Sequence, residues 1–327
     1  DWRILYIFLL YSYTLIKFDI FIRVIFYYII LFIMKTFIVV DTSYAIFYRY
    51  HATKRWYSFA HREDYNSIDN YFLDEVFKSK FKKLFVDMFT PLFKKYKSDF
   101  HHVIFAKDCP RKNIWRNDYI QKYKGTRTTK EKDKCIGDFF KYTYQSILPE
   151  LEQKYSTKMI ECATLEGDDC IYIIKDILSH HYSDQPIVII ASDHDLMQLL
   201  DNYQNNPPKE TQEDSQQCAQ QQGRIQIINL KGKSLHEKSC GDSRKDLEIK
   251  IITGDKSDNI PGCFPKCGYK TALKLVNNKE LLEQKFMKHE GSREIYERNK
   301  KIISFAGIPK DLYKKCYETY DEMLSTY

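Results

Sequence analysis

Acidic side chains recur in this sequence just after stretches that are typical of buried β-strands. Four short apolar runs, 37–40, 102–106, 158–163 and 187–191, have the β-rich composition of such strands. Carboxylates follow each run, namely Asp41, Asp108, the trio Glu166, Asp168 and Asp169, and the pair Asp193 and Asp195. One acid at the start of a helix is explained by capping of free backbone N–H groups. Four successive cases favour a shared chemical site instead.

The chemistry open to such a site is metal-assisted. In an open parallel sheet the carboxyl ends of the strands lie along one edge, where ligands bind. Carboxylates gathered there repel one another unless cations are present, and Mg²⁺ and Mn²⁺ prefer oxygen ligands of this kind. Two cations about 4 Å apart can hold a phosphodiester, activate water and stabilise the leaving oxygen. The pattern therefore predicts phosphodiester hydrolysis with two or more Mg²⁺ ions, for which Mn²⁺ can substitute.

The stretch GDKSDNIPG, from Gly254 to Gly262, adds two more carboxylates, Asp255 and Asp258. The Pro-Gly pair that closes it is typical of a turn. The residues alone leave open whether this is a surface turn, a phosphatase loop or part of the metal site. The following segment GYKTALKLV, which starts at Gly268, predicts a helix whose N-terminus can receive a phosphate.

Positive charge is concentrated in residues 107–134, which contain ten Lys or Arg residues and only four acids. Tyr123 and other aromatic residues are interleaved with Arg111 and Arg116. Cations that face phosphates, with aromatic rings available for base stacking, are typical of a nucleic-acid contact. A solvated charged helix would look similar, but this stretch directly follows an acidic strand end. We therefore expect Arg111, Arg116 and Tyr123 to contact nucleic acid.

These side chains need a scaffold that brings distant parts of the chain to one edge. Amphipathic helical patterns, at 72–96 and 168–182 among others, separate the apolar runs, and a further strand is expected at 224–230. Continuous apolar strands that alternate with helices predict an α/β fold with a mainly parallel sheet flanked by helices. The chain of 327 residues, 43% of them apolar, is long enough to bury a substantial core around that sheet.

Charge and cysteine content restrict the class of protein further. The net charge of +7 permits an acidic partner without identifying one. The nine cysteines form no CxxC pair and show no zinc-ligand spacing, which favours free thiols and an intracellular, reducing compartment. We expect the closest pair, Cys263 and Cys267, to be free thiols as well.

Two segments differ from the rest in composition. Residues 1–33 are almost all Ile, Leu, Phe and Tyr, but three charged side chains break them into runs shorter than the roughly 20 residues that span a bilayer. We interpret them as an upstream translated segment ahead of Met34 and outside the fold, with a membrane anchor as the alternative, and we expect no membrane partner. Residues 202–223 are polar and rich in glutamine, which predicts a disordered surface insertion.

Taken in order, the motifs VVDTS, AKD with WR and YKGTR, EGDD, ASDHDLMQLL and GDKSDNIPG with CGYKTALKL resemble the 5′-nuclease family. That family includes flap endonucleases, phage 5′-3′ exonucleases and phage RNase H. The resemblance covers Met34 to about Leu312 and implies a PIN-like nuclease domain followed by a smaller, α-helical helix-hairpin-helix domain. We place the nuclease domain at 34–235, with the basic arch at 107–134, and the helix-hairpin-helix region at 236–327.

The resemblance also implies metal-binding and catalytic roles. Lys124 and Arg127 match the basic residues that clamp the scissile phosphate. Asp169 lies beside the metal ligands with a less defined role. The two implied metal groups are Asp41, Asp108, Glu166 and Asp168, and Asp193, Asp195, Asp255 and Asp258.

Contacts to the duplex are implied in the same way. Phe47 matches an aromatic residue that stacks on a terminal base, although a place in the core would suit a phenylalanine equally well. The hairpin from Gly262 to Gly268, with Lys270 just after it, matches the element that grips duplex phosphates through backbone N–H groups. Here the hairpin reads GCFPKCG, where relatives often carry a GxG core, so the duplex contact is expected to differ in detail.

The function expected from the resemblance is that of a structure-selective 5′ nuclease, a 5′-3′ exonuclease or flap endonuclease of replication and repair. Its partner would be DNA with 5′ ends, flaps or nicks, with an RNA–DNA hybrid left open, and it would act as a monomer without a clear clamp-binding motif. A PIN-type endoribonuclease and a non-catalytic DNA-binding scaffold are the alternatives. A haloacid-dehalogenase-type phosphatase is disfavoured because Ser43 stands where that class needs a second acid.

Overall fold

The fold is taken from a computed structural model, which describes residues 35–62, 68–125, 135–200, 224–235 and 239–327. The predictions for 1–33 and for the glutamine-rich segment 202–223 lie outside these residues. Within them, no helix combines the length and the apolar character needed to cross a membrane.

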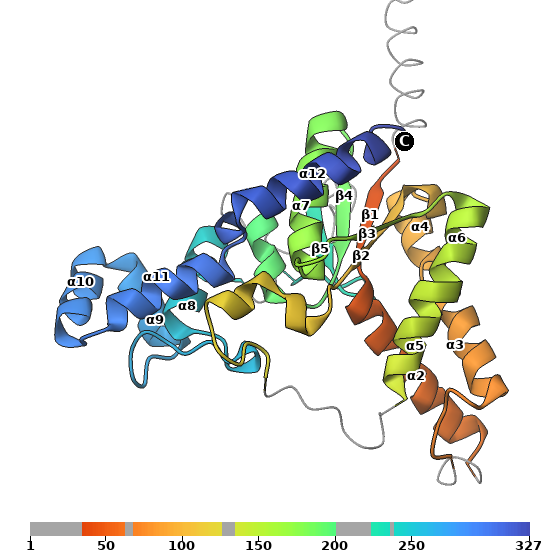
Figure 1. The fold of residues 1–327 in the computed structure, drawn as a ribbon, viewed down its shortest axis with the longest axis horizontal. Helices are drawn as coiled ribbons and strands as arrows, with labels where there is room; N and C mark the ends of the chain where they lie inside the picture. Colours follow the sequence, from red (N-terminus) through yellow and green to blue (C-terminus); the bar gives the residue numbers. More distant parts are fainter. Residues whose placement is uncertain (1–34, 63–67, 126–134, 201–223, 236–238) are drawn as a thin grey trace, which may run out of the picture.

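A five-stranded parallel sheet forms the centre of the molecule (Figure 1). Its strands are β1 (Phe37–Asp41), β2 (Val103–Lys107), β3 (Lys158–Glu161), β4 (Ile187–Ile190) and β5 (Ile225–Ile228). They lie in the order β3-β2-β1-β4-β5, and every adjacent pair is parallel. The predicted strands and the predicted parallel α/β sheet are therefore confirmed. The chain order reverses between β1 and β4, which is where an open sheet of this type binds its ligands.

Helices cover both faces of the sheet, which explains why its strands are apolar on both sides. In β1, Ile38 and Val40 pack with the helices that follow β1 and surround β2, whereas Phe37 and Val39 pack on the opposite face. The first layer contains α2 (Thr42–Ala60), α3 (Glu75–Asp87), α4 (Thr90–Tyr96), α5 (Ile136–Tyr142) and α6 (Leu148–Tyr155). The second layer contains α7 (Gly167–His181) and α12 (Lys310–Leu324), as Figure 1 shows.

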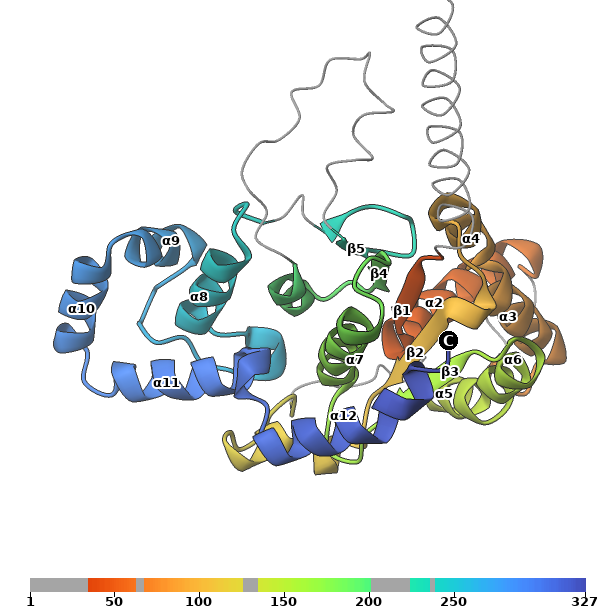
Figure 2. The same ribbon diagram turned by 90° about the horizontal axis from the view of Figure 1, so that it is seen from above.

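A smaller helical lobe extends from one end of the domain that contains the sheet (Figure 2). It consists of α8 (Ser243–Thr253), α9 (Tyr269–Asn277), α10 (Lys279–Lys288) and α11 (Ser292–Ile303). The hairpin 262–268 connects α8 to α9, as the helix-hairpin-helix prediction requires. The region assigned to this lobe at 236–327 is too long, however, because Phe305, Cys316 and Leu324 are buried in the same core as α7. The last helix thus returns to the sheet.

A disulfide between Cys162 and Cys316 links α12 to the end of β3. The expectation of free thiols is therefore wrong for this pair, because residues 154 positions apart in sequence meet in the fold. Sequence spacing alone gives no sign of such a long-range contact. Cys263 and Cys267 are free, as predicted.

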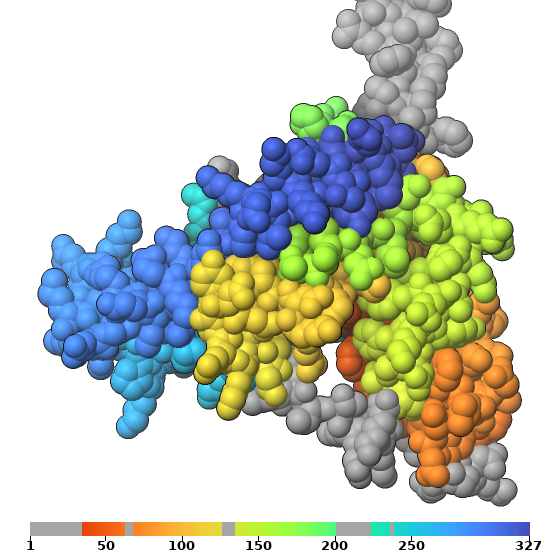
Figure 3. All heavy atoms as spheres, viewed as in Figure 1, coloured from red at the N-terminus to blue at the C-terminus, as the bar shows by residue number. Residues whose placement is uncertain are grey.

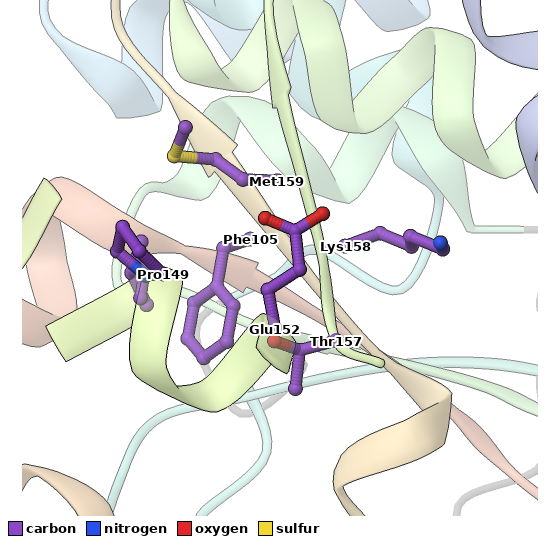
Figure 4. Close-up of a pocket in the computed structure, with 7 residues that line it drawn as sticks. Phe105, Pro149, Glu152, Thr157, Lys158 and Met159 are labelled. Carbon is purple, nitrogen blue, oxygen red and sulfur yellow. The ribbon is translucent and has the colours of Figure 1, made fainter. Parts of the chain in front are cut away.

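A cavity of about 20 Å³ lies between α6 and the beginning of β3 (Figure 4). Phe105, Pro149, Thr157 and Met159 contribute to its lining. This volume holds about one water molecule. It also lies at the amino end of β3, away from the carboxylates, so it takes no part in the site described next.

Candidate active site

The carboxyl ends of β1 and β2 bring Asp41 and Asp108 to the same edge of the sheet. The strand register pairs Asp41 with Ala106, two residues before Asp108. Asp41 ends β1 and caps α2, where its Oδ1 accepts a hydrogen bond from the backbone N–H of Tyr44 at 2.9 Å. Burial, followed by repulsion from Asp108, raises the pKa of Asp41 to about 7. Two carboxylates that disfavour each other's charge in this way are suited to a shared cation.

Asp108 is held in place by two donors from different elements. The hydroxyl of Ser43, in the first turn of α2, donates to Oδ2 at 2.5 Å. The backbone N–H of Gly167, at the start of α7, donates to Oδ1 at 2.6 Å. A Cβ atom at position 167 would lie only 3.1 Å from that same oxygen, so the glycine lets the helix approach the carboxylate closely. Asp108 is thereby fixed between the ends of β1 and β3.

The N-terminus of α7 supplies Glu166 and Asp168, and positions them differently. Glu166 is the N-cap residue and accepts hydrogen bonds from Arg116, Tyr123 and Lys124 at 2.9, 3.0 and 2.5 Å. Asp168 makes no hydrogen bond or ion pair with any described residue. Burial and then repulsion from Glu166 raise the pKa of Asp168 well above its usual range. Lys124 and Arg116 offset only part of this effect, which is the situation that a bound cation relieves.

Asp169, the next residue, faces away from that position. Its two oxygens accept hydrogen bonds from both terminal nitrogens of Arg116, each at 2.7 Å, and the indole N–H of Trp115 donates to it at 3.0 Å. Asp169 is fully buried, and Arg116 is only 3% exposed. The Nε of Arg116 also donates to the backbone carbonyl of Ile302 at 2.7 Å. The structure therefore places Asp169 in a buried ion pair that joins α7, the basic segment and α11.

Across the sheet, the end of β4 supplies Asp193 and Asp195, which meet a loop of the helical lobe. Asp193 caps a short helical turn by accepting from the N–H of Asp195 at 2.9 Å. Lys250, in the last turn of α8, forms an ion pair with Asp195 and another with Asp255 at 2.9 Å. Burial, and then Asp193, raise the pKa of Asp195 to about 6. Although burial alone would raise it, Lys250 and Ser257 lower the pKa of Asp255 to about 2.

The GDKSDNIPG stretch forms the turn that carries Asp255 and Asp258 into the site. Gly254 adopts φ +69°, and a Cβ atom there would lie 2.4 Å from the carbonyl oxygen of Ile260. Only glycine allows that approach, and the backbones of Asp255 and Ile260 form two hydrogen bonds across the turn, at 2.9 and 2.8 Å. The alternative of a plain surface turn is therefore excluded, because Asp258 is 6% exposed and points at Tyr123 and Lys124.

The basic segment after β2 closes over the carboxylates from one side. The Nζ of Lys124 lies 3.6 Å from Asp258, in addition to its contact with Glu166. The backbone N–H of Lys124 donates to the carbonyl of Asp258 at 3.1 Å, and the side chain of Asn259 donates to the carbonyl of Lys122 at 2.9 Å. Figure 3 shows the surface hollowed between this segment and α5. Lys124 is therefore at the site, whereas Arg127 lies outside the described residues.

Arg116 and Tyr123, which were expected to contact nucleic acid at the surface, are buried instead. Arg116 is buried in the ion pair with Asp169, and Tyr123 is 8% exposed with its hydroxyl at 3.0 Å from Glu166 and 3.3 Å from Asp258. Both predictions are wrong in this respect, because tertiary contacts turn these side chains inward to orient carboxylates. Arg111 is exposed, as an outer contact requires.

The remaining predicted contacts lie at the surface. Phe47 is 46% exposed, and its ring packs edge-on against Phe140 at 5.2 Å and parallel to His51 at 6.3 Å. A core role for Phe47 is thereby disfavoured. Gly268 is the N-cap residue of α9, and Lys270 is exposed in its first turn. The amide end of α9 is thus open to an anion, in the position predicted from the hairpin.

Several residues that contact the carboxylates of the site were not assigned that role from the sequence. Ser43, Trp115 and Lys250 each contact a predicted carboxylate. Lys250 has a recognisable signal, since it stands one helical turn before Gly254 at the end of a helix that leads into the acidic turn. Ser43 and Trp115 have none, because their partners are 65 and 54 residues away.

The carboxylates of the site provide oxygen ligands of the kind that a divalent cation prefers. Among the described residues, only Cys162, Cys170 and Cys316 offer three ligand atoms that all lie within 4.8 Å of one another, and two of these sulfurs are joined in the disulfide. The carboxylate oxygens are spread more widely. Their chemistry nevertheless fits hard cations, because burial, followed by repulsion from neighbouring carboxylates, raises the pKa values of Asp41, Asp168 and Asp195.

Comparison with known proteins identifies the family of this chain. Residues 36–223 match the family described as 5′-3′ exonuclease, N-terminal resolvase-like domain. The chain is 28% identical over 215 residues to a 5′-3′ exonuclease of Buchnera aphidicola, covering 65% of each chain. It is 29% identical over 184 residues to a 5′-3′ exonuclease of Bacillus subtilis, covering 56% of this chain and 54% of the relative. The chain thus spans between half and two thirds of these relatives.

The fold has a solved counterpart. A bacteriophage T5 flap endonuclease, in a pseudo-enzyme-product complex with DNA and metal ions, superimposes with a TM-score of 0.60. The match covers 90% of this chain and all of that one, at 16% sequence identity. At that identity the likeness is one of fold, and it includes the helical lobe as well as the sheet.

Proposed function

The chain belongs to the family of 5′-3′ exonucleases with an N-terminal resolvase-like domain, and from that premise we propose that it is a structure-selective 5′ nuclease. It hydrolyses phosphodiester bonds in 5′-ended or branched duplex DNA, with an RNA–DNA hybrid as a second substrate class, and leaves a 5′-phosphate. The observation that carries the proposal is that Asp41, Asp108 and Asp168 follow the carboxyl ends of neighbouring parallel strands, with Lys124 close enough to interact with Asp41 and Asp168.

Divalent cations, Mg²⁺ or Mn²⁺, are proposed as the cofactor. Asp41, Asp108, Glu166 and Asp168 would hold one group of ions, and the second ligand group is Asp193, Asp195, Asp255 and Asp258. Asp169 is left out of the set because Arg116 and Trp115 occupy both of its oxygens. When bound, such ions supply positive charge at the scissile phosphate and lower the pKa of the attacking water.

The protein's own groups orient the ligands and the substrate. Ser43 and Gly167 fix the two oxygens of Asp108, and Arg116 and Tyr123 fix Glu166. Lys124 is placed to stabilise negative charge that develops on the phosphate, because its ammonium group lies among the carboxylates while staying charged. Although burial alone would lower it, Glu166 and Asp168 raise the pKa of Lys124 above its ordinary value.

Duplex recognition is assigned to the outer surface. Lys270 and the N-terminus of α9 would contact backbone phosphates, with Arg111 beside the basic segment and Phe47 stacking on an end base. Lys270 lies on α9 and Phe47 on α2, and Figure 2 shows these two helices on opposite sides of α7.

The test is cleavage by the full chain of end-labelled flap, nicked, blunt-duplex and RNA-primed substrates in Mg²⁺. We expect cleavage near the junction or the 5′ end, product ends that carry a 5′-phosphate, and no cleavage in EDTA. Cleavage of single-stranded RNA in preference to every duplex would favour a PIN-type endoribonuclease. Tight binding of the flap without cleavage in Mg²⁺ or Mn²⁺ would favour a non-catalytic scaffold.

A further inference from the structure

Three cysteine sulfurs form a cluster that the proposed function does not use. Cys162 directly follows β3, Cys170 is the fourth residue of α7, and Cys316 lies in α12. Their Sγ atoms all lie within 4.8 Å of one another, and no other three His, Cys, Asp or Glu residues of the described chain bring ligand atoms as close together. The disulfide uses two of these sulfurs, so it does not account for the third.

The three elements that carry the cysteine cluster are also held together by contacts that involve no sulfur. The hydroxyl of Tyr320 in α12 donates to the backbone carbonyl of Glu161 at 2.5 Å and accepts from the N–H of Glu161 at 2.9 Å. The hydroxyl of Tyr313, also in α12, donates to Asp176 of α7 at 2.9 Å. Reduction of the disulfide therefore leaves the elements, and with them the three sulfurs, side by side.

Three thiols in this arrangement are a ligand set for a soft divalent cation. Zinc binds Cys thiolates at about 2.3 Å in a tetrahedron, which places two sulfurs about 3.8 Å apart. The sulfurs of the cluster already lie within 4.8 Å of one another, and the Cα atoms of Cys162 and Cys316, 6.2 Å apart, leave room for two unbonded sulfurs. Magnesium prefers oxygen ligands, so the cysteine cluster and the carboxylates select different ions.

The burial of the cluster suits a structural ion. Cys170 is fully buried and Cys316 is 2% exposed, whereas Cys162 is half-buried. Binding of structural zinc is coupled to folding, so such a site requires no open channel. Burial, followed by Asp169, raises the pKa of the Cys170 thiol well above its ordinary value, so zinc has to displace the proton of this sulfur. The carboxylate that disfavours a bare thiolate there also attracts a cation.

We propose that the reduced chain binds one Zn²⁺ ion through Cys162, Cys170 and Cys316, with a water molecule as the fourth ligand. The ion joins the end of β3, α7 and α12, whereas the disulfide joins only the first and the last of these. Because Glu166 caps α7 one turn before Cys170, the ion fixes the helix that carries part of the acidic site. The disulfide occupies two of the three ligands and therefore excludes the ion.

The experiment follows cobalt binding by the reduced full chain. A trialkylphosphine and water convert the disulfide into two thiols and the phosphine oxide, after which Co²⁺ is added as a spectroscopic substitute for Zn²⁺. We expect a thiolate-to-cobalt charge-transfer band that Zn²⁺ abolishes. Cobalt bound by carboxylates gives no such band, so the acidic site does not interfere. The unreduced chain should give no band either.

Cys170→Ser tests the sulfur that the disulfide does not use. It should lose most of the band and bind Zn²⁺ at least about 100-fold more weakly in a competition titration, because even changes outside the ligand set cost about 10-fold to 100-fold. Cys267→Ser is the matched control, since it removes a free, half-buried cysteine of the hairpin, and should keep the band. If circular dichroism shows that Cys170→Ser does not fold, Cys162→Ser at the half-buried position replaces it.

Three results would overturn the zinc site. They are absence of the band from the reduced wild type, an undiminished band in the folded ligand variant, and loss of the band in Cys267→Ser. Cleavage of the flap substrate by the same preparations in Mg²⁺ tests the nuclease function separately, because the cobalt band does not depend on activity.

Discussion

The ammonium group of Lys124 lies 2.5 Å from the carboxylate of Glu166, on a chain segment that approaches α7 from 42 residues away. Lys124 is only 12% exposed at its side chain. Its own backbone N–H is bonded to Asp258 from the other half of the molecule. Lys124 therefore links Glu166 at the start of α7 and its own basic segment to Asp258 in the acidic turn.

Removing this lysine should affect turnover more than binding. In Lys124→Ala, single-turnover cleavage of a saturating flap substrate should fall by on the order of 10²-fold or more, the scale lost with a charge-stabilising contact in the transition state. Lys112→Ala, which removes an exposed cation of the same segment, should leave that rate unchanged and weaken affinity slightly. A wild-type rate for Lys124→Ala would show that the lysine is only a docking contact.

Asp168→Asn should abolish cleavage and leave DNA affinity nearly unchanged. The substitution removes one anionic ligand but keeps the shape of the side chain and the basic surface intact. Because burial and repulsion from Glu166 outweigh the attraction of Lys124 and Arg116 and raise the pKa of Asp168, the variant should also be at least as stable as the wild type without divalent ions. Cleavage rates, flap binding and thermal unfolding in EDTA check the three parts, and wild-type turnover would reject the metal assignment.

Asp169→Asn should behave in the opposite way, although the two residues are adjacent. It leaves the buried guanidinium of Arg116 without its bidentate partner, which typically costs about 3–5 kcal/mol of folding free energy. We expect a clearly lower urea midpoint for Asp169→Asn, and residual activity in the fraction that stays folded. A stable but inactive Asp169→Asn would instead return this residue to the set of metal ligands.

Stability without divalent ions should fall as pH rises from about 4 to about 7. Burial and Asp108 raise the pKa of Asp41 from 3.8 in its ordinary state to about 7 in the fold, so the folded protein binds a proton in this range that the unfolded chain has released. This loss of stability is absent below the lower pKa, 3.8, and complete above the upper pKa, about 7. Thermal unfolding in EDTA across this range measures the slope.

Two variants identify the group responsible for that slope. Asp41→Asn keeps an oxygen that can cap α2 and should flatten the pH dependence, leaving the smaller contribution of Asp195, whose pKa is raised to about 6. Asp184→Asn, an exposed carboxylate, should leave the slope as it is. An unchanged slope in Asp41→Asn would mean that other groups carry it.

The sequence by itself determined the strands, their parallel arrangement and the acids at their ends. Apolar runs such as 37–40 and 187–190 need burial on both faces, and a sheet covered by helices on both faces is the structure that provides it. Once the strands are parallel, their carboxyl ends share an edge, so Asp41 and Asp108 meet without further information. The acidic turn was also predicted, from the Pro-Gly pair that closes it, whereas the need for glycine at Gly254 follows from the φ of +69° in the structure.

Only the tertiary structure decided which way individual side chains face. Asp168 and Asp169 are one residue apart, and a helix rotates by about 100° per residue, so one faces the site and the other faces Arg116. Arg116 and Tyr123 turn inward toward partners 43 to 186 residues away, Lys250 pairs with Asp195 across 55 residues, and Cys162 is bonded to Cys316 across 154. Such contacts follow from the packing of elements in three dimensions, and no local pattern of residue types records them.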